Sequence, residues 1–238
     1  NKYIIKVKEF NNINKLYFDN NKRFKDDDLK LIAAELDFTI FNEVSTSLFI
    51  DETKKLYESF GYNNVNIDYS EKINEETNTV DLYFNIQEGN ITNINRIIFE
   101  GNEKILSQEI YEVIKSRTKT IRNLFANNNY KPAVVERDKF KITDYYKNNG
   151  FLDATVDLKI EYLENNKVNI YFNIFEGKRY NLSSIDIIDK SNLLNANIFN
   201  LILVKKNDYL KREKIFSLKK INKLKDEIST IIIDNGVD

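Results

Sequence analysis

Carboxylates are the side chains of this sequence best placed to do chemistry, because its 238 residues include no histidine and no cysteine. Without these two residue types, the chain has no serine–histidine triad, no thiol nucleophile and none of the usual zinc ligand sets. An enzyme would therefore have to use carboxylates, lysines or tyrosines alone. Two glutamates, Glu88 and Glu176, share one setting, since each follows an alternating apolar run and directly precedes a glycine.

A structural role accounts for these carboxylates more simply than catalysis does. Glu88 and Glu176 stand at the ends of predicted strands, which favours a structural or solvated role over an acid–base role. Asp26, Asp27 and Asp28 could bind a metal ion, but they open a predicted helix. Acidic residues at that place usually interact with the helix dipole and with solvent. We therefore expect no enzyme, no metal and no cofactor.

The two glutamates belong to a pattern that recurs along the chain. Predicted helices end at Gly61, Gly150 and Gly236, which are 89 and 86 residues apart, and the two glycines after the glutamates are 88 apart. All six glycines serve this pattern at predicted turns and helix caps: Gly61, Gly89, Gly101, Gly150, Gly177 and Gly236. A period of this length is the signature of a repeat array.

Apolar periodicity predicts each copy as a strand, two helices and two strands. In the first copy the strand passes through Ile13 and Phe18, the helices cover about 29–36 and the stretch up to Phe60, and the last strands cover 65–69 and 79–87. The second copy has strands over 94–100, 154–162 and 167–175 and helices over 107–115 and 132–148. The third has a strand over 182–188 and helices over 194–203 and about 218–232, without a final hairpin.

These copies predict four segments. Residues 1–11 are expected to be the last strand of a preceding unit, 12–89 and 90–177 two complete units, and 178–238 a unit truncated before its final hairpin. The links Gly89-Asn90 and Gly177-Lys178 are too short for free tumbling, so we expect a semi-rigid array. No apolar run approaches the roughly 20 residues that span a bilayer. We expect a soluble piece of a longer polypeptide.

Charge argues against a nucleic-acid partner. The formal net charge is −1, the isoelectric point is about 5.9, and basic and acidic residues are interleaved. A protein that binds the phosphate backbone of nucleic acid normally presents a clustered basic face.

The recurring pattern resembles the POTRA domains of the BamA family of outer-membrane protein assembly factors. The resemblance covers nearly the whole chain and is carried by three motifs: Phe99-Glu100-Gly101-Asn102, the run from Tyr145 to Ala154, and Phe172-Asn173-Ile174-Phe175-Glu176-Gly177. It implies an α+β fold, in which a three-stranded mixed sheet packs under two antiparallel helices. The long loop before Pro132 fits the third POTRA domain of that family, so the chain resembles the second to fourth.

The resemblance also implies a binding mode and partners. The second strand of each unit would lie at the sheet edge, where another chain can add a strand. Implied partners are unfolded outer-membrane proteins, accessory assembly lipoproteins and a C-terminal outer-membrane β-barrel of the same polypeptide, in the periplasm. The candidate edge residues are Asp153, Ala154, Thr155, Val156, Asp157, Leu158, Lys159 and Ile160, and Asn64, Val65, Asn66, Ile67, Asp68 and Tyr69.

Two other classes remain open. The POTRA region of a related transporter, such as a two-partner secretion pore or a TamA-like protein, is the nearer alternative. A KH-like RNA-binding array shares the order of elements, but it requires a Gly-x-x-Gly clamp. No such spacing of glycines occurs in the sequence.

Overall fold

The computed structural model describes residues 9–120, 126–190 and 194–236. The chain divides into two compact units. Among the described residues, one contains 9–96, 116–120, 126–135 and 161–169, and the other contains 97–115, 136–160, 170–190 and 194–236. Most of residues 1–11, where the last strand of a preceding unit is expected, lies outside the described residues, which begin at Glu9.

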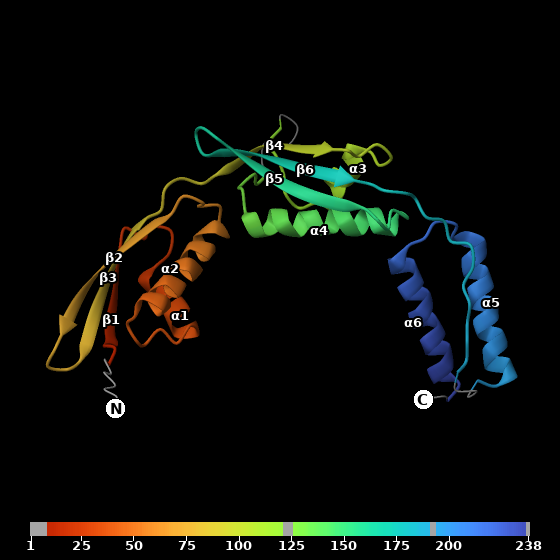
Figure 1. Ribbon diagram of the computed structural model, residues 1–238, viewed down its shortest axis with the longest axis horizontal. Helices are drawn as coiled ribbons and strands as arrows, with labels where there is room; N and C mark the ends of the chain where they lie inside the picture. Colours follow the sequence, from red (N-terminus) through yellow and green to blue (C-terminus); the bar gives the residue numbers. More distant parts are fainter. Residues whose placement is uncertain (1–8, 121–125, 191–193, 237–238) are drawn as a thin grey trace, which may run out of the picture. The chain divides into compact units, whose positions relative to one another are not determined.

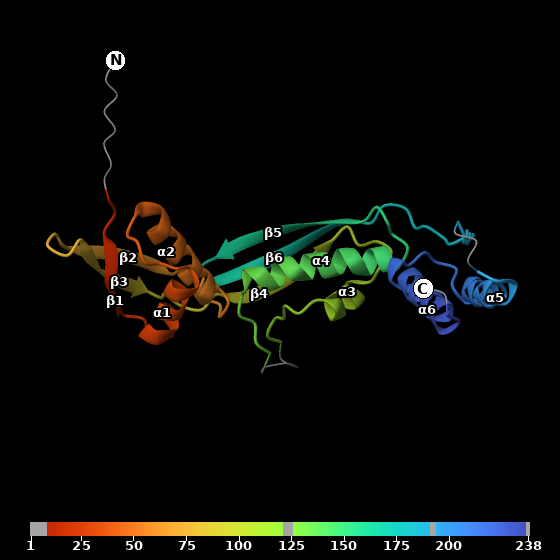
Figure 2. The ribbon, with the colours of Figure 1, turned by 90° about the horizontal axis from the view of Figure 1, so that it is seen from below.

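The first repeat, residues 12–89, is a three-stranded sheet with two helices on one face (Figures 1 and 2). Its elements are β1 (Asn12–Asp19), α1 (Asp26–Glu35), α2 (Glu43–Glu58), β2 (Asn66–Asn74) and β3 (Thr79–Gln87). The strand order is β1-β3-β2, with β1 parallel and β2 antiparallel to β3. The expected mixed sheet is confirmed.

The core of this repeat forms where the apolar face of β3 packs against the apolar face of α2. Successive side chains of β3 point to opposite faces, so Val80, Leu82, Phe84 and Ile86 are buried while the residues between them are not. On α2, Phe49 and Tyr57 lie on one face and are fully buried. The rings of Phe49 and Phe84 meet with centroids 5.0 Å apart.

The second repeat, residues 90–177, has the same order of elements. It comprises β4 (Asn93–Glu100), α3 (Ser107–Val113), α4 (Pro132–Asn148), β5 (Thr155–Leu163) and β6 (Lys167–Phe175), in the strand order β4-β6-β5. Pro132 starts α4, where a missing N–H costs nothing. Along α4, Val135, Ile142 and Tyr146 are buried, whereas Phe140 is 63% exposed. The apolar stripe is therefore real, and Phe140 faces solvent.

The third set of elements consists of two helices, α5 (Ala196–Arg212) and α6 (Leu218–Asp234). They pack on each other, and Lys205 Nζ of α5 lies 2.9 Å from Glu227 Oε2 of α6. The predicted strand over 182–188 is wrong, because only an isolated bridge between Asn181 and Ile215 forms there. A strand requires pairing along its length, and in the described chain the pairing here is limited to this bridge and to the N–H of Leu182, which donates to the carbonyl of Lys214.

The other differences concern the ends of elements. Helix α1 begins at Asp26, so the three aspartates that were expected at its opening form its first turn ahead of the predicted body from about residue 29. The carboxylate of Asp28 accepts the backbone N–H of Lys25 at 2.9 Å and so caps this turn. Helix α5 continues nine residues past its predicted end at Leu203. None of the helices in the described ranges combines the length and apolar character that crossing a bilayer requires.

Candidate binding edges

Strand β2 forms a regular, open edge of the first sheet. All nine of its residues pair with β3 in one unbroken register, from Asn66 opposite Gln87 to Asn74 opposite Thr79. Within the described residues no strand pairs with its outer side. An edge of this kind presents unpaired backbone N–H and C=O groups and can accept an added strand.

The opposite edge, formed by β1, is partly closed. Its register with β3 shifts between Ile13 and Lys15, and such an irregularity twists a strand and weakens its use as a template. The loop before α2 also covers its start. The N–H of Ile13 donates to the carbonyl of Thr39 at 2.8 Å, and the N–H of Phe41 donates to that of Asn11 at 2.9 Å. Of the two edges, β2 is the more open.

The second repeat repeats this asymmetry. An isolated bridge joins Asn93, at the start of β4, to Asn129 in the loop before α4. The N–H of Ile94 donates to the carbonyl of Asn128 at 2.7 Å. Strand β5 occupies the other edge, and no described strand pairs with its outer side. The position of β5 therefore matches that of β2.

The side chains of β5 alternate between the buried and the exposed face of the sheet. Val156 is 4% exposed and Leu158 and Ile160 are half-buried, whereas Thr155, Asp157 and Lys159 are exposed. The strand begins at Thr155, so Asp153 and Ala154 precede it. In the first repeat Asn64 and Val65 likewise precede β2, while Asn66, Ile67, Asp68 and Tyr69 lie in it. Both strands also continue past the predicted ends, to Leu163 and Asn74.

Apolar side chains accompany the β2 edge on its helix-facing side. Tyr69 is 41% and Ile73 is 48% exposed, although both follow the buried Ile67 in the alternation. The ring of Tyr69 contacts Phe41 edge-on, with centroids 6.2 Å apart, and lies 5.9 Å from Phe84. An added strand would find apolar surface beside its backbone partner here.

Glu88 in the first repeat and Glu176 in the second each connect three elements of their own repeat through hydrogen bonds. The carboxylate of Glu176 is buried and accepts the hydroxyl of Tyr146 at 3.1 Å and the backbone N–H groups of Lys104 and Ile105 at 3.0 and 3.3 Å. Glu88 accepts the hydroxyl of Tyr57 at 2.9 Å and the N–H of Arg23 at 2.6 Å. Each carboxylate joins the last strand, the second helix and the turn after the first strand. This geometry supports the structural role.

Burial and these carboxylates change the acidity of the tyrosines. Burial, followed by the hydrogen bond to Glu88, raises the pKa of Tyr57 above its ordinary value, and burial followed by the bond to Glu176 does the same for Tyr146. Both effects favour the neutral phenol, which is the form that donates to the glutamate.

The glycines occupy positions that side chains resist. All six have positive φ, as the predicted turns and caps require. At Gly150, with φ +92°, an added Cβ would lie 2.7 Å from Ile215 Cγ2 and 2.9 Å from the carbonyl oxygen of Tyr180. Asn20, in the place that Gly101 holds in the second repeat, takes φ +67° itself, and its side chain donates to Asn85 Oδ1 at 2.7 Å.

Among the described residues, no three His, Cys, Asp or Glu side chains lie together as a group that could hold a metal ion. The three aspartates form the first turn of α1, and Asp28 caps it.

Comparison with known proteins decides the family. The POTRA family model, described as a surface antigen variable number repeat, matches residues 12–89 and 92–177, which is more than half of the chain. The chain belongs to the POTRA family. Its two complete repeats are therefore POTRA repeats, with the α+β fold that the resemblance implied.

Curated relatives place these repeats in longer proteins. The chain is 23% identical over 218 residues to the outer membrane protein assembly factor BamA of Nitratidesulfovibrio vulgaris, covering 89% of this chain and 27% of that protein. It is 27% identical over 191 residues to a putative outer membrane protein assembly factor of Treponema pallidum, covering 76% and 22%. A crystal structure of POTRA domains 3–5 of Haemophilus influenzae BamA aligns over 96% of this chain and 87% of that one, at 15% identity and a TM-score of 0.47. The chain thus spans about a quarter of the length of the curated relatives.

Sequence reasoning missed the hydrogen bonds between the tyrosines and the glutamates. A usable signal was present, because Tyr57 and Tyr146 each stand four residues before the glycine that ends their helix, Gly61 and Gly150. It also missed the contacts that the residues before β2 and β5 make with the following repeat. The contacts before β2 and before β5 use different side chains, so no shared sequence motif predicts them.

Proposed function

We propose that this chain is a non-enzymatic POTRA scaffold of an outer-membrane protein assembly factor, which captures unfolded outer-membrane proteins by adding their strands to β2 and β5. The observation that supports it most is the asymmetry of the sheets. In the first, β1 is closed at its start by the loop before α2, while β2 pairs regularly and offers its outer backbone. The assembly role is that of the relatives, which are named outer membrane protein assembly factors. The periplasmic location and the accessory lipoproteins as further partners are what the resemblance to the BamA family implies.

Magnitudes favour weak, reversible capture. A strand added to a nine-residue edge forms roughly five to eight backbone hydrogen bonds, each contributing about 1 kcal/mol net. Association costs an estimated 4 kcal/mol or more. One edge alone therefore binds transiently, and two edges in series on one client raise the overall affinity without new contacts. A client in transit has to be released, which suits weak individual sites.

Disulfide trapping tests the proposal directly, because the chain has no cysteine of its own. Asp157→Cys places a single thiol on the exposed face of β5, and Arg96→Cys places one on β4 at the other edge of the same sheet. A strand paired with β5 brings its Cβ atoms within about 5.5 Å of the opposite residues. A β-strand peptide from an outer-membrane protein with one cysteine should therefore cross-link to Asp157→Cys and much less to Arg96→Cys.

Sequence dependence supplies the second readout. Backbone pairing tolerates many sequences, so a scrambled peptide that keeps the apolar and polar alternation should cross-link about equally well. A peptide N-methylated at consecutive residues loses the donors on both of its edges and should not cross-link. Equal trapping at both cysteines, or trapping that ignores N-methylation, would rule out capture at the β5 edge.

A further inference from the structure

One residue lies just before each edge strand, at the place where its repeat contacts the following repeat. Asn64 lies three residues after Gly61 and two before β2, and Asp153 lies three residues after Gly150 and two before β5. We refer to Asn64 and Asp153 as the joint residues. Both are exposed, so burial does not hold them in place.

The glycine that follows the last strand of the same repeat lies close to each joint residue. A Cβ added at Gly89 would lie 3.1 Å from the carbonyl oxygen of Asn64, and one added at Gly177 would lie 3.0 Å from the Cβ of Asp153. Both glycines have φ +67°. The end of the third strand thus contacts the segment that leads into the edge strand, in both repeats.

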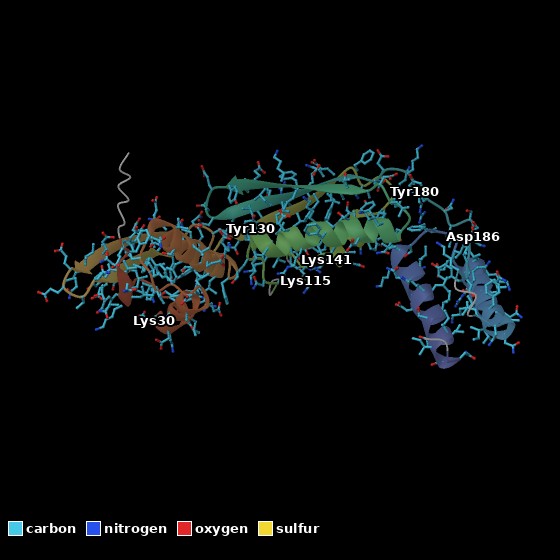
Figure 3. The ribbon with its side chains drawn as sticks, turned by 60° about the horizontal axis from the view of Figure 1, so that its bottom comes forward. Lys30, Lys115, Tyr130, Lys141, Tyr180 and Asp186 are labelled. Carbon is cyan, nitrogen blue, oxygen red and sulfur yellow. The ribbon has the colours of Figure 1, made fainter. Side chains whose placement is uncertain are left out.

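Each joint residue also forms a side-chain hydrogen bond with the following repeat. Nδ2 of Asn64 donates to Oδ1 of Asn166 in the turn between β5 and β6, at 3.2 Å. The hydroxyl of Tyr180, labelled in Figure 3, donates to Oδ2 of Asp153 at 2.7 Å. The first pair lies inside one compact unit and the second pair inside the other.

Backbone bonds show that these contacts belong to a repeated joint. The N–H of Thr92 donates to the carbonyl of Gly61 at 2.8 Å, and the N–H of Tyr180 donates to that of Gly150, also at 2.8 Å. In each case the residue that opens the following repeat bonds the glycine that ends the preceding helix. The side chains at the two joints differ, with an amide pair at the first and a phenol–carboxylate pair at the second.

We infer that each joint anchors the start of the preceding repeat's edge strand, so that seating of the following repeat controls whether that edge is ordered enough to accept a client strand. The inference deepens the proposed function and rests on it for the client. The anchoring itself concerns this chain alone. Because the two joints use different side chains, each edge can be loosened separately.

Hydrogen exchange measured by mass spectrometry on the full chain, without any client, tests the anchoring. Tyr180→Phe removes only the hydroxyl that bonds Asp153, and Asn64→Ala removes only the amide that bonds Asn166. Loss of one exposed hydrogen bond should speed exchange of the nearby amides about two- to fivefold. Tyr180→Phe should do so at the start of β5 and not in β2, and Asn64→Ala should do so at the start of β2 and not in β5.

Each variant is thus the control for the other. Exchange that stays unchanged in both strands, or that rises equally in both strands of either variant, overturns the inference. Disulfide trapping at Asp157→Cys then separates the two proposals. Anchoring with capture predicts that Tyr180→Phe lowers the trapping yield about two- to fivefold. Suppose that each variant speeds exchange only in its own edge strand, but that Asp157→Cys alone traps no peptide. That result would support the anchoring and refute the capture.

Discussion

At the scale of the residue, the carboxylates with the best prospect of chemistry are used as structural acceptors. Glu176 accepts two backbone N–H groups and one phenol in a buried site, and Glu88 accepts one of each. These bonds fix the orientation of each carboxylate. A carboxylate engaged in this way connects three elements of its repeat.

The raised tyrosine pKa values predict how stability depends on pH. The folded state holds the phenol protons of Tyr57 and Tyr146 more tightly than the unfolded chain does. Their contribution is therefore complete below pH of about 10, the ordinary tyrosine pKa, and is lost progressively as pH rises above it. Thermal unfolding followed from pH 8 to 11 should show a falling midpoint above pH 10.

The double variant Tyr57→Phe, Tyr146→Phe isolates this effect. It should lower the midpoint at pH 8, since each lost hydrogen bond contributes about 1 kcal/mol, and it should flatten the fall above pH 10. Tyr162→Phe, at an exposed position in β5, is the control, and its midpoint should fall above pH 10 as steeply as that of the unmodified chain. A double variant whose midpoint falls as steeply as the parent's would contradict the assignment.

At the scale of the element, the helix ends show which features follow from sequence and which do not. The glycine spacing predicts the ends of α2, α4 and α6, and all three glycines have positive φ. The alternation predicts β6 to the residue, because a buried central strand has a strong period of two. The edge strands were misjudged at their ends, since exposure on both faces weakens that period. The strand over 182–188 was predicted from a local pattern, but pairing is not local.

Helix caps allow a comparison within one chain. Gly150→Ala meets both an unfavourable φ and close contacts with Ile215 and Tyr180, whereas at Gly236, with φ +77°, an added Cβ meets nothing within 4 Å. The backbone term alone costs about 1–2 kcal/mol. Gly150→Ala should therefore lower the free energy of unfolding by more than Gly236→Ala, as urea denaturation can measure. Equal losses would mean that the contacts around Gly150 relax at no cost.

At the scale of the whole molecule, the chain presents the same kind of edge more than once. The sheets of the first and second repeats place β2 and β5 at equivalent edges, and in both the loop before the second helix covers the start of the first strand. The repeat and its fold class follow from the sequence and the resemblance. The partial closure of β1 and β4 does not, because it depends on loop conformations that no motif marks.

Amide chemical shifts of the ¹⁵N-labelled chain, titrated with an outer-membrane β-strand peptide, test the central claim most directly. Backbone pairing engages alternate residues of an edge strand. The account predicts that every second amide of β5 or β2 shifts and becomes protected from exchange, while the amides of the central strands β6 and β3 change little. Shifts confined to the amides of helix residues with exposed apolar side chains, such as Val44 and Leu48 on α2, would place the peptide on a helix face and contradict capture at the edges.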